Sequence, residues 1–302
     1  MKILPIFILF VVFNSAAFGQ DCLETAFESP PIVSMETWKT YQTKLAQAKA
    51  DHEKSPNADS LIWLGRRTAY LGNYKEAIKI FTKGIQEFPR DARFYRHRGH
   101  RFITIRCFDD AIKDFEMAAK LVKGKADEIE PDGLPNARNI ATSTLQSNIF
   151  YHLGLAYYLK GDFKKALKAY RNAEKVSKNP DMLAATTHWL YMTLRRLGKT
   201  KTAEKTVIEI KDDLDIIENT DYYKLVKLYQ GKSKVEDLLK EIGEKADTLG
   251  NASLGYGLGN WFLYNGEIEK ALKIFRQLTS GNQWASFGYI AAEAELANIK
   301  KP

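Results

Sequence analysis

The sequence predicts an all-α protein built as a solenoid of stacked helix-turn-helix units, with a helical cap at each end. Three observations lead to this prediction. A short turn pattern returns at intervals near 34 residues, which is the spacing of two-helix repeats. Apolar residues between the turns follow helical spacing, and no sustained alternation of apolar and polar residues indicates a β-strand. Apolar residues make up 45% of the 302 residues, which suits a continuous core between stacked units.

The first element, residues 1–19, is expected to be a cleaved export signal. Lys2 precedes an apolar run from Ile3 to Phe13, and Ala17-Phe18-Gly19 places small residues before a cleavage point at Gln20. The run is well short of the roughly 20 residues that span a bilayer. We therefore expect an exported, periplasmic or secreted protein without a transmembrane segment after cleavage. A lipid anchor on Cys22 is the weaker alternative, because the residues before it do not form the usual small-residue box.

Residues 20–57 are expected to form an N-terminal segment and a capping helix. Trp38, Tyr41 and Leu45 fall on one helical stripe, as a cap over the first repeat requires. The chain has two cysteines, Cys22 and Cys107. A disulfide between them would suit an exported protein, and two free thiols are an equally good interpretation.

About six repeat units are expected over residues 58–282. Copies of the turn pattern begin at Gly72, Arg106, Gly161, Gly198, Gly231 and Gly266, in steps of 34, 55, 37, 33 and 35 residues. The copy at Gly231 is weak, so the fifth unit, about 217–250, is degenerate. The long step contains an insertion at about 124–141, and residues 283–302 are expected to be the C-terminal cap and tail.

Each unit has a small residue where its two helices must touch. These residues are Gly65, Gly99, Gly154 and Gly259 on the first helices, opposite Phe81, Phe115, Tyr170 and Phe275 on the second. In the fourth unit Tyr191 replaces the small residue. The pattern resembles the tetratricopeptide-repeat family over about residues 58–282, and several longer segments are similar to a group of exported bacterial repeat proteins. The resemblance implies a right-handed solenoid and brings no activity that can be named.

In this family the first helix of each unit lines a concave groove. Helical geometry at about 100° per residue then gives the groove-facing positions, where arginines and aromatic residues gather. The expected groove residues are Arg66, Arg93, Arg96, His97, His100, Tyr151, His152, Tyr158, His188, Trp189, Arg195 and Arg196. The same positions also carry Ile103, Leu155, Leu159 and Met192.

This lining predicts an anionic ligand. Arginine forks suit carboxylate, phosphate or sulfate groups, and the formal net charge of +8 favours an acidic partner. We expect an acidic peptide, a protein segment, or a glycan or lipid headgroup. Nucleic acid is not expected in an exported protein. The alternative is a solvated groove without a ligand, in a scaffold that binds protein partners by its convex face and caps. The oligomeric state is left open.

The insertion at 124–141 is too long for an ordinary turn between helices. It carries several acids, among them Glu130 and Asp132, with Pro131 and Gly133 between them. We expect a lid or a built-in mimic of an acidic ligand, with Asn136 and Arg138 reaching the ligand. The alternative is a surface loop on the convex side.

No catalytic site, cofactor or metal site is predicted. Phosphate-binding glycine loops, dinucleotide fingerprints and nucleophile elbows are missing from the sequence. The third-ranked hypothesis is a metal-dependent hydrolase in which His97, His100 and His152 converge on zinc. No acid stands near them in the repeat pattern to act as a general base.

Overall fold

The computed structural model describes residues 20–244 and 249–299, of which about 71% are helical. The export signal expected at 1–19 lies outside the described residues. The helices are α1 (Gln20–Thr25), α2 (Met35–Lys54), α3 (Ala58–Tyr70), α4 (Tyr74–Glu87), α5 (Ala92–Thr104), α6 (Phe108–Val122), α7 (Leu145–Leu159), α8 (Phe163–Val176), α9 (Pro180–Arg196), α10 (Thr200–Ile208), α11 (Thr220–Tyr229), α12 (Val235–Glu244), α13 (Leu249–Tyr264), α14 (Ile268–Thr279) and α15 (Phe287–Ile299).

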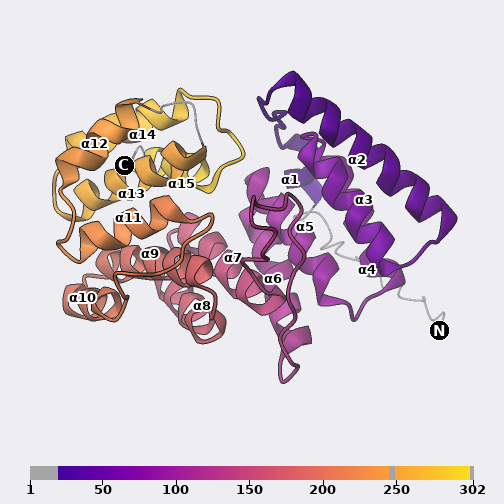
Figure 1. Ribbon diagram of the computed structural model, residues 1–302, viewed down its shortest axis with the longest axis horizontal. Coiled ribbons are helices and arrows are strands. Elements are labelled where there is room, and N and C mark those ends of the chain that lie inside the picture. The colour runs from indigo at the N-terminus through magenta and orange to yellow at the C-terminus, as the bar shows by residue number, and fades with distance from the viewer. Residues whose placement is uncertain (1–19, 245–248, 300–302) are drawn as a thin grey trace, which may run out of the picture.

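Consecutive helices pair as α3/α4, α5/α6, α7/α8, α9/α10 and α13/α14, whereas α11 packs on α9 and α13, and α12 packs on α13 (Figure 1). α2 covers the first pair and α15 packs on the last. The all-α solenoid predicted from the turn pattern is confirmed. None of the helices in 20–244 and 249–299 is both long and apolar enough to cross a bilayer.

The turn inside each pair needs a residue with positive φ. Gly72, Gly161, Gly198, Gly231 and Gly266 supply it with φ between 69° and 86°. Glycine adopts this left-handed conformation without the steric cost that a Cβ atom brings. In the second pair the position is taken by Arg106, with φ 67°.

Small residues let the two helices of a pair approach, as predicted. The contacts are Gly65 with Phe81, Gly99 with Phe115, Gly154 with Tyr170 and Gly259 with Phe275. A Cβ atom built on these glycines would lie 2.4, 3.0, 2.7 and 2.5 Å from the facing ring. Each ring therefore occupies the volume of a missing side chain. In the fourth pair Tyr191 stands in the glycine position and stacks on Tyr229, with ring centroids 4.0 Å apart.

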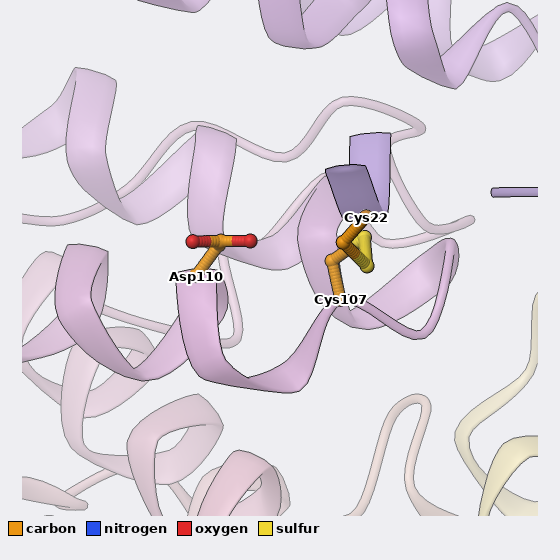
Figure 2. A group of neighbouring side chains, drawn as sticks. All are labelled: Cys22, Cys107 and Asp110. Carbon is orange, nitrogen blue, oxygen red and sulfur yellow. A yellow bond between two sulfur atoms is a disulfide. The ribbon is translucent and has the colours of Figure 1, made fainter. Parts of the chain in front are cut away.

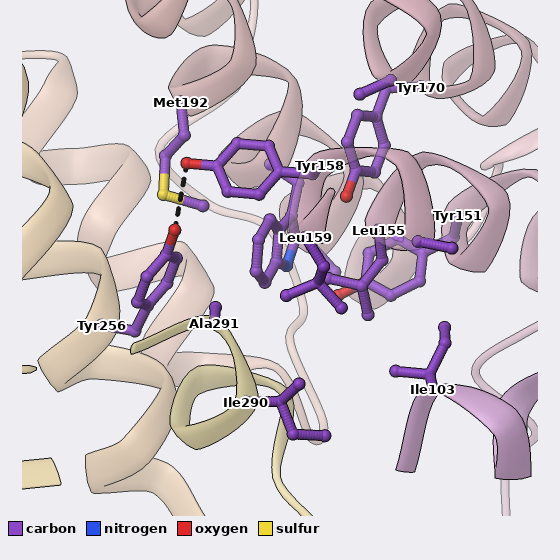
Figure 3. Close-up of a cluster of buried hydrophobic side chains, with 14 of the residues drawn as sticks. Ile103, Tyr151, Leu155, Tyr158, Leu159, Tyr170, Met192, Tyr256, Ile290 and Ala291 are labelled. Atoms are coloured by element: carbon purple, nitrogen blue, oxygen red, sulfur yellow. Dashed lines mark hydrogen bonds between the residues drawn. The ribbon is translucent and has the colours of Figure 1, made fainter. Parts of the chain in front are cut away.

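The last helices turn into the concave side of the solenoid. α13 packs against α9 and α11, and α15 packs against α13 and α7. Figure 3 shows the result: Tyr256 of α13 and Ile290 of α15 lie beside Tyr158 and Leu155 of α7 in one apolar cluster. The expected groove positions Ile103, Leu155, Leu159 and Met192 are buried in that cluster and do not line an open groove.

A disulfide ties the N-terminal segment to the second pair. Cys22 and Cys107 are bonded, which decides between the two interpretations left open by the sequence (Figure 2). Beyond Cys22 the chain runs past the first pair, where the backbone N–H of Lys75 donates to Glu28 Oε1 at 2.5 Å. Phe27 then meets Trp284, just before α15, edge to face at 5.8 Å. The segment thus contacts both ends of the repeat array.

The insertion joins α6 to α7 as an extended segment, residues 123–144. It includes an isolated β-bridge between Ile129 and Thr144. Its central part lies against α3 and α5, and its distal part reaches the connection between α10 and α11. Figure 1 shows the segment in magenta, passing in front of α5 to α7. The alternative of a loop packed on the convex side is therefore wrong.

Candidate functional site

The concave side of the first two pairs holds a small polar cavity of about 110 Å³, which we call the basic pocket. It is lined by Arg66, Ala69, Tyr70, Phe81, Arg96, His97, His100, Arg101 and Glu130. All of these residues except Glu130 come from α3, α4 and α5. Glu130 comes from the 123–144 segment that covers the pocket.

The covering segment binds the helices beneath it as an extended peptide would. The Glu130 carboxylate is buried, with Oε2 2.9 Å from Arg96 Nε. Arg66 donates to the carbonyl oxygen of Pro131 at 2.8 Å, and Arg67 to that of Gly133 at 2.6 Å. One ion pair and two hydrogen bonds to backbone carbonyls therefore hold residues 129–133.

Gly133 is required where the segment crosses α3. A Cβ atom there would lie 1.5 Å from the Tyr70 hydroxyl oxygen and 2.9 Å from an Arg66 nitrogen. The backbone of Gly133 therefore sits directly on the rim of the basic pocket. Any side chain at this position has to displace Tyr70 or lift the segment.

Neutral histidines complete the pocket. An Arg96 nitrogen lies 3.1 Å from His97 Nδ1 and 3.4 Å from His100 Nδ1. Burial and the neighbouring arginines lower the pKa of both imidazoles well below the usual range. The rings are therefore uncharged at neutral pH and accept hydrogen bonds from Arg96. The charges lining the pocket are Arg66, Arg96 and Arg101 against Glu130, so 3 − 1 leaves +2.

The remaining predicted arginines lie elsewhere and have partners within the chain. Arg93, at the N-terminus of α5, pairs with Asp91 and Asp59, and these hydrogen bonds raise its pKa. Arg195, on α9, donates to Asn265 at 2.7 Å and lies over the Tyr264 ring at 4.2 Å. The expected continuous basic groove is thus divided.

Arg196 belongs to a buried polar network at the other end of the concave side. It pairs with Glu295 of α15, which also accepts from the Tyr256 hydroxyl at 3.2 Å. Tyr158 accepts from Tyr256 at 3.1 Å and from Asn260 at 2.9 Å, and burial raises the pKa of Tyr158 to about 12. This network joins α7, α9, α13 and α15.

Other expected groove residues lie in the core. Tyr151, His152 and Trp189 are buried, and the Nδ1–H of His152 donates to the Asn148 carbonyl oxygen at 2.6 Å. His188 Nδ1 lies 3.0 Å from the Tyr229 hydroxyl, and burial lowers the pKa of His188 to about 3. These side chains stabilise the packing and face no open groove.

The two residues expected to reach a ligand from the insertion fix the insertion instead. Arg138 forms two hydrogen bonds to Asp215, at 2.7 and 2.9 Å. Asn136 donates to the Ile140 carbonyl oxygen at 2.7 Å. Thr142 donates to Glu218 at 2.6 Å. The segment is therefore held at its central part, residues 129–133, and at its distal part, residues 136–142.

Within the described ranges, a single group of three potential metal ligands is found: Cys22, Cys107 and Asp110, with ligand atoms within 4.8 Å of one another (Figure 2). Both sulfur atoms are in the disulfide, so neither is a thiolate. The three histidines of the hydrolase hypothesis form no such group with an acid in this part of the chain.

The sequence pattern did not predict Arg67 or Arg101 as residues of the site. Glu130 was named among the acids of the insertion, but its contact with Arg96 was not predicted. Arg67 and Arg101 are 34 residues apart and so occupy the same position in successive units. That recurrence was the available signal. Their position on the first helix lies between the groove-facing positions and the positions that face the core.

Comparisons with known proteins agree with this architecture. The tetratricopeptide-repeat family profile matches residues 147–180, which include all of α8 and most of α7. The Small glutamine-rich tetratricopeptide repeat-containing protein 2 of Saccharomyces cerevisiae is 24% identical over 166 residues, 55% of this chain and 42% of that protein. The BBSome complex member BBS4 of Bos taurus is 26% identical over 156 residues, 49% of this chain and 26% of that protein. The chain spans less than half the length of these curated relatives.

Solved structures similar to the chain include MamA, with 18% identity, a TM-score of 0.44 and coverage of 67% of this chain and 97% of MamA. YrrB, described as a TPR protein with an unusual peptide-binding site, has 16% identity, a TM-score of 0.44 and coverage of 82% and 97%. The recurring turn, the glycine–aromatic contacts and the profile match at residues 147–180 together support the tetratricopeptide-repeat family, and the chain has an all-α solenoid fold of the kind that suggests a module binding proteins or peptides.

Proposed function

We propose that the chain is an exported binding module that captures an extended acidic segment of a partner protein over the basic pocket, in exchange for its own residues 129–133. The observation that carries the proposal is the way the chain's own acidic segment is held there. Glu130 pairs with Arg96, while Arg66 and Arg67 bind backbone carbonyls of the segment.

Each of these contacts recognises a chemical group that a partner protein can also supply. The arginine fork of Arg96 recognises a carboxylate, and hydrogen bonds to backbone carbonyls recognise any extended chain. Binding from within the same molecule benefits from a high effective concentration. A partner segment therefore competes only if it makes additional contacts, for which the cleft beside Trp63 and Ile129, about 290 Å³, offers space.

The export part of the proposal is supported by the N-terminal sequence and by the Cys22–Cys107 disulfide. Disulfides persist in oxidising compartments and are rare in the cytosol of most organisms. Sequencing the N-terminus of the protein recovered from its native host tests this part. A mature start at Gln20 is the expected result, and retention of Met1 would contradict it.

A peptide titration tests the binding part. In the first variant, residues 126–141 are replaced by a short Gly-Ser linker, which opens the site; α6 and α7 pack side by side, so a short connection can join them. The probe is a synthetic peptide with the sequence of residues 127–135, measured by fluorescence anisotropy. We expect saturable binding to the linker variant and at least tenfold weaker binding to the intact chain.

Two changes to the linker variant serve as controls. Arg96→Met removes the partner of the Glu130 carboxylate and should weaken binding at least tenfold, because loss of one member of a buried ion pair costs about 3–5 kcal/mol. Arg276→Met, at an exposed position on α14, should leave binding unchanged. Equal affinity of all three proteins for the peptide would show that the basic pocket is not the binding site.

A further inference from the structure

Arg101 is the feature of the basic pocket that the covering segment leaves unexplained. Arg101 lines the pocket and is partly buried, with its guanidinium Cζ 5.7 Å from the centre of the Tyr74 ring. Burial lowers the pKa of Arg101 to about 10, so it is charged at neutral pH. Among the residues that the structure describes, no carboxylate or carbonyl accepts a hydrogen bond from this guanidinium, which has five N–H donors.

The neighbouring acid is already engaged. Glu130 faces Arg96, which is 7% exposed, at 2.9 Å. Burial raises the pKa of Tyr74, so its hydroxyl is uncharged at neutral pH. The pocket is therefore left with the +2 excess counted above. Arg101 is only partly buried, so water reaches its guanidinium, but a cation in a cavity that already carries excess positive charge still favours an anionic partner over water.

We propose that the basic pocket binds a small tetrahedral oxyanion of the phosphate or sulfate class, held by Arg101 together with Arg96 and Arg66. A dianion balances the excess charge of +2. Planar guanidinium groups bind such oxygens through paired N–H donors. His97 and His100, which are neutral, add no repulsion between cations and have ring N–H groups available as further donors.

The size of the pocket agrees with this ligand class. About 10–15 Å³ of such volume is enough for one water molecule, and the pocket offers about 110 Å³. An ion with four oxygen atoms fits, whereas a peptide segment does not. Because the backbone of Gly133 closes the rim against Tyr70 and Arg66, a free ion is favoured over a phosphate or sulfate group attached to a larger molecule.

This inference does not rest on capture of a partner segment, because it concerns the intact chain with residues 129–133 in place. It is tested with the purified disulfide-bonded protein in Tris-chloride. Sodium phosphate, sodium sulfate and sodium chloride are titrated at matched ionic strength, with Tm from differential scanning fluorimetry and Kd from isothermal titration calorimetry. Phosphate or sulfate should raise Tm saturably, and chloride should not.

Three variants identify the residue responsible. Arg101→Met should weaken the oxyanion at least tenfold while its Tm in chloride is no lower than that of the unmodified chain, because an unpaired charge has been removed. Arg101→Lys keeps the charge without the fork and should weaken binding by a smaller factor. Arg276→Met, on the exposed side of α14, should bind as the unmodified chain does.

The possible outcomes separate cleanly. A Tm that follows ionic strength alone, or an Arg101→Met protein that binds with unchanged Kd, would overturn the proposal. If Arg101→Met does not fold, loss of affinity in Arg101→Lys with retention in Arg276→Met still supports it. O-phosphoserine is titrated as the last probe. Weaker binding of O-phosphoserine than of inorganic phosphate supports a free ion as the ligand. Tighter binding of O-phosphoserine would contradict the argument that the Gly133 backbone at the rim excludes larger phosphate-bearing molecules.

Discussion

Arg106 occupies a turn position where five other units have glycine, and its side chain explains the exception. Its guanidinium group pairs with Glu293 of α15 at 2.6 Å and donates to the Trp284 carbonyl oxygen at 2.9 Å. It also lies over the Trp284 ring at 3.9 Å. A left-handed backbone costs a residue with a Cβ atom roughly 1–2 kcal/mol. The contacts to α15 offset this cost.

Two substitutions separate the backbone cost from the contacts. Arg106→Gly loses the contacts and relieves the backbone, so we expect it to lower the free energy of unfolding by about 1–2 kcal/mol. Arg106→Ala loses the contacts and keeps the cost of the left-handed backbone. We therefore expect its free energy of unfolding to be lower than that of Arg106→Gly by roughly 1 kcal/mol. Urea denaturation measures both, and equal stability of the two variants would contradict the backbone argument.

At this scale the sequence predicts which residue types gather on the concave side but not what they bind. Arg96 and Arg196 were both expected there, and both lie on inward-facing first helices. Their partners Glu130 and Glu295 come from segments 34 and 99 residues away. Helical spacing assigns a residue to a face of its own helix and contains no information on which distant segment covers that face.

The contacts inside each helix pair could be predicted from the sequence, because the two partners of each contact lie close together in the chain. Each glycine and its facing ring are 16 residues apart, as Gly154 and Tyr170 illustrate. One repeat length therefore contains both partners, and the close approach was predictable from the sequence. The individual contacts of the 123–144 segment with α3 and with the α10–α11 connection were not predictable, because they follow from the curvature of the whole array.

Alanine substitutions at two helical glycines test the contact with the ring. Gly154→Ala places a Cβ atom 2.7 Å from the Tyr170 ring, and overpacking of this kind costs about 1–3 kcal/mol. Gly243→Ala is the matched control in α12, because nothing lies within 4 Å of a Cβ atom there. Helix propensity alone should stabilise Gly243→Ala by about 0.5–1 kcal/mol.

We therefore expect opposite changes in the urea midpoint for these two variants. Thermal denaturation followed by circular dichroism provides a second measure. If Gly154→Ala is stabilised as much as Gly243→Ala, the ring at Tyr170 does not restrict the helix–helix distance.

The molecule as a whole holds four histidines in a neutral state, three of them buried and His100 partly buried. Burial lowers the pKa values of His97, His100, His152 and His188 in the folded protein. The unfolded chain takes up protons near pH 6.5 that the folded chain does not, so the free energy of unfolding falls as pH decreases through that value. Each histidine contributes a loss of about 1 kcal/mol between pH 7.5 and 5.5.

Urea denaturation at pH 7.5 and 5.5 measures this loss. His188→Gln removes one titrating group, and we expect it to reduce the loss by about 1 kcal/mol. The wider window down to the pKa of His188, about 3, includes carboxylate titration, so the comparison is restricted to pH 5.5 and above. An unchanged difference between the two pH values in His188→Gln would contradict the assignment.

The closure of the concave side is the largest departure from the expected open groove. The sequence contained one sign of it, since Ile103, Leu155 and Met192 are apolar at positions assigned to the groove. Such residues need a cover, and α13 and α15 provide it (Figure 3). The position of α13 and α15 over the concave side depends on the small rotation that each repeat unit adds, and the spacing of the repeats does not specify this rotation.

The contact between Arg106 and Glu293 joins residues 187 positions apart, across most of the array. In an open array, a unit can be duplicated or lost without affecting the distant units, because each contacts only its neighbours. Here the gain or loss of one unit would shift α15 by about one helix-pair spacing, with neighbouring helices 8–10 Å apart, and Arg106 would face the wrong residue. The number of repeats is thus constrained by geometry, and homologues that keep an arginine at this turn are expected to keep the same repeat count.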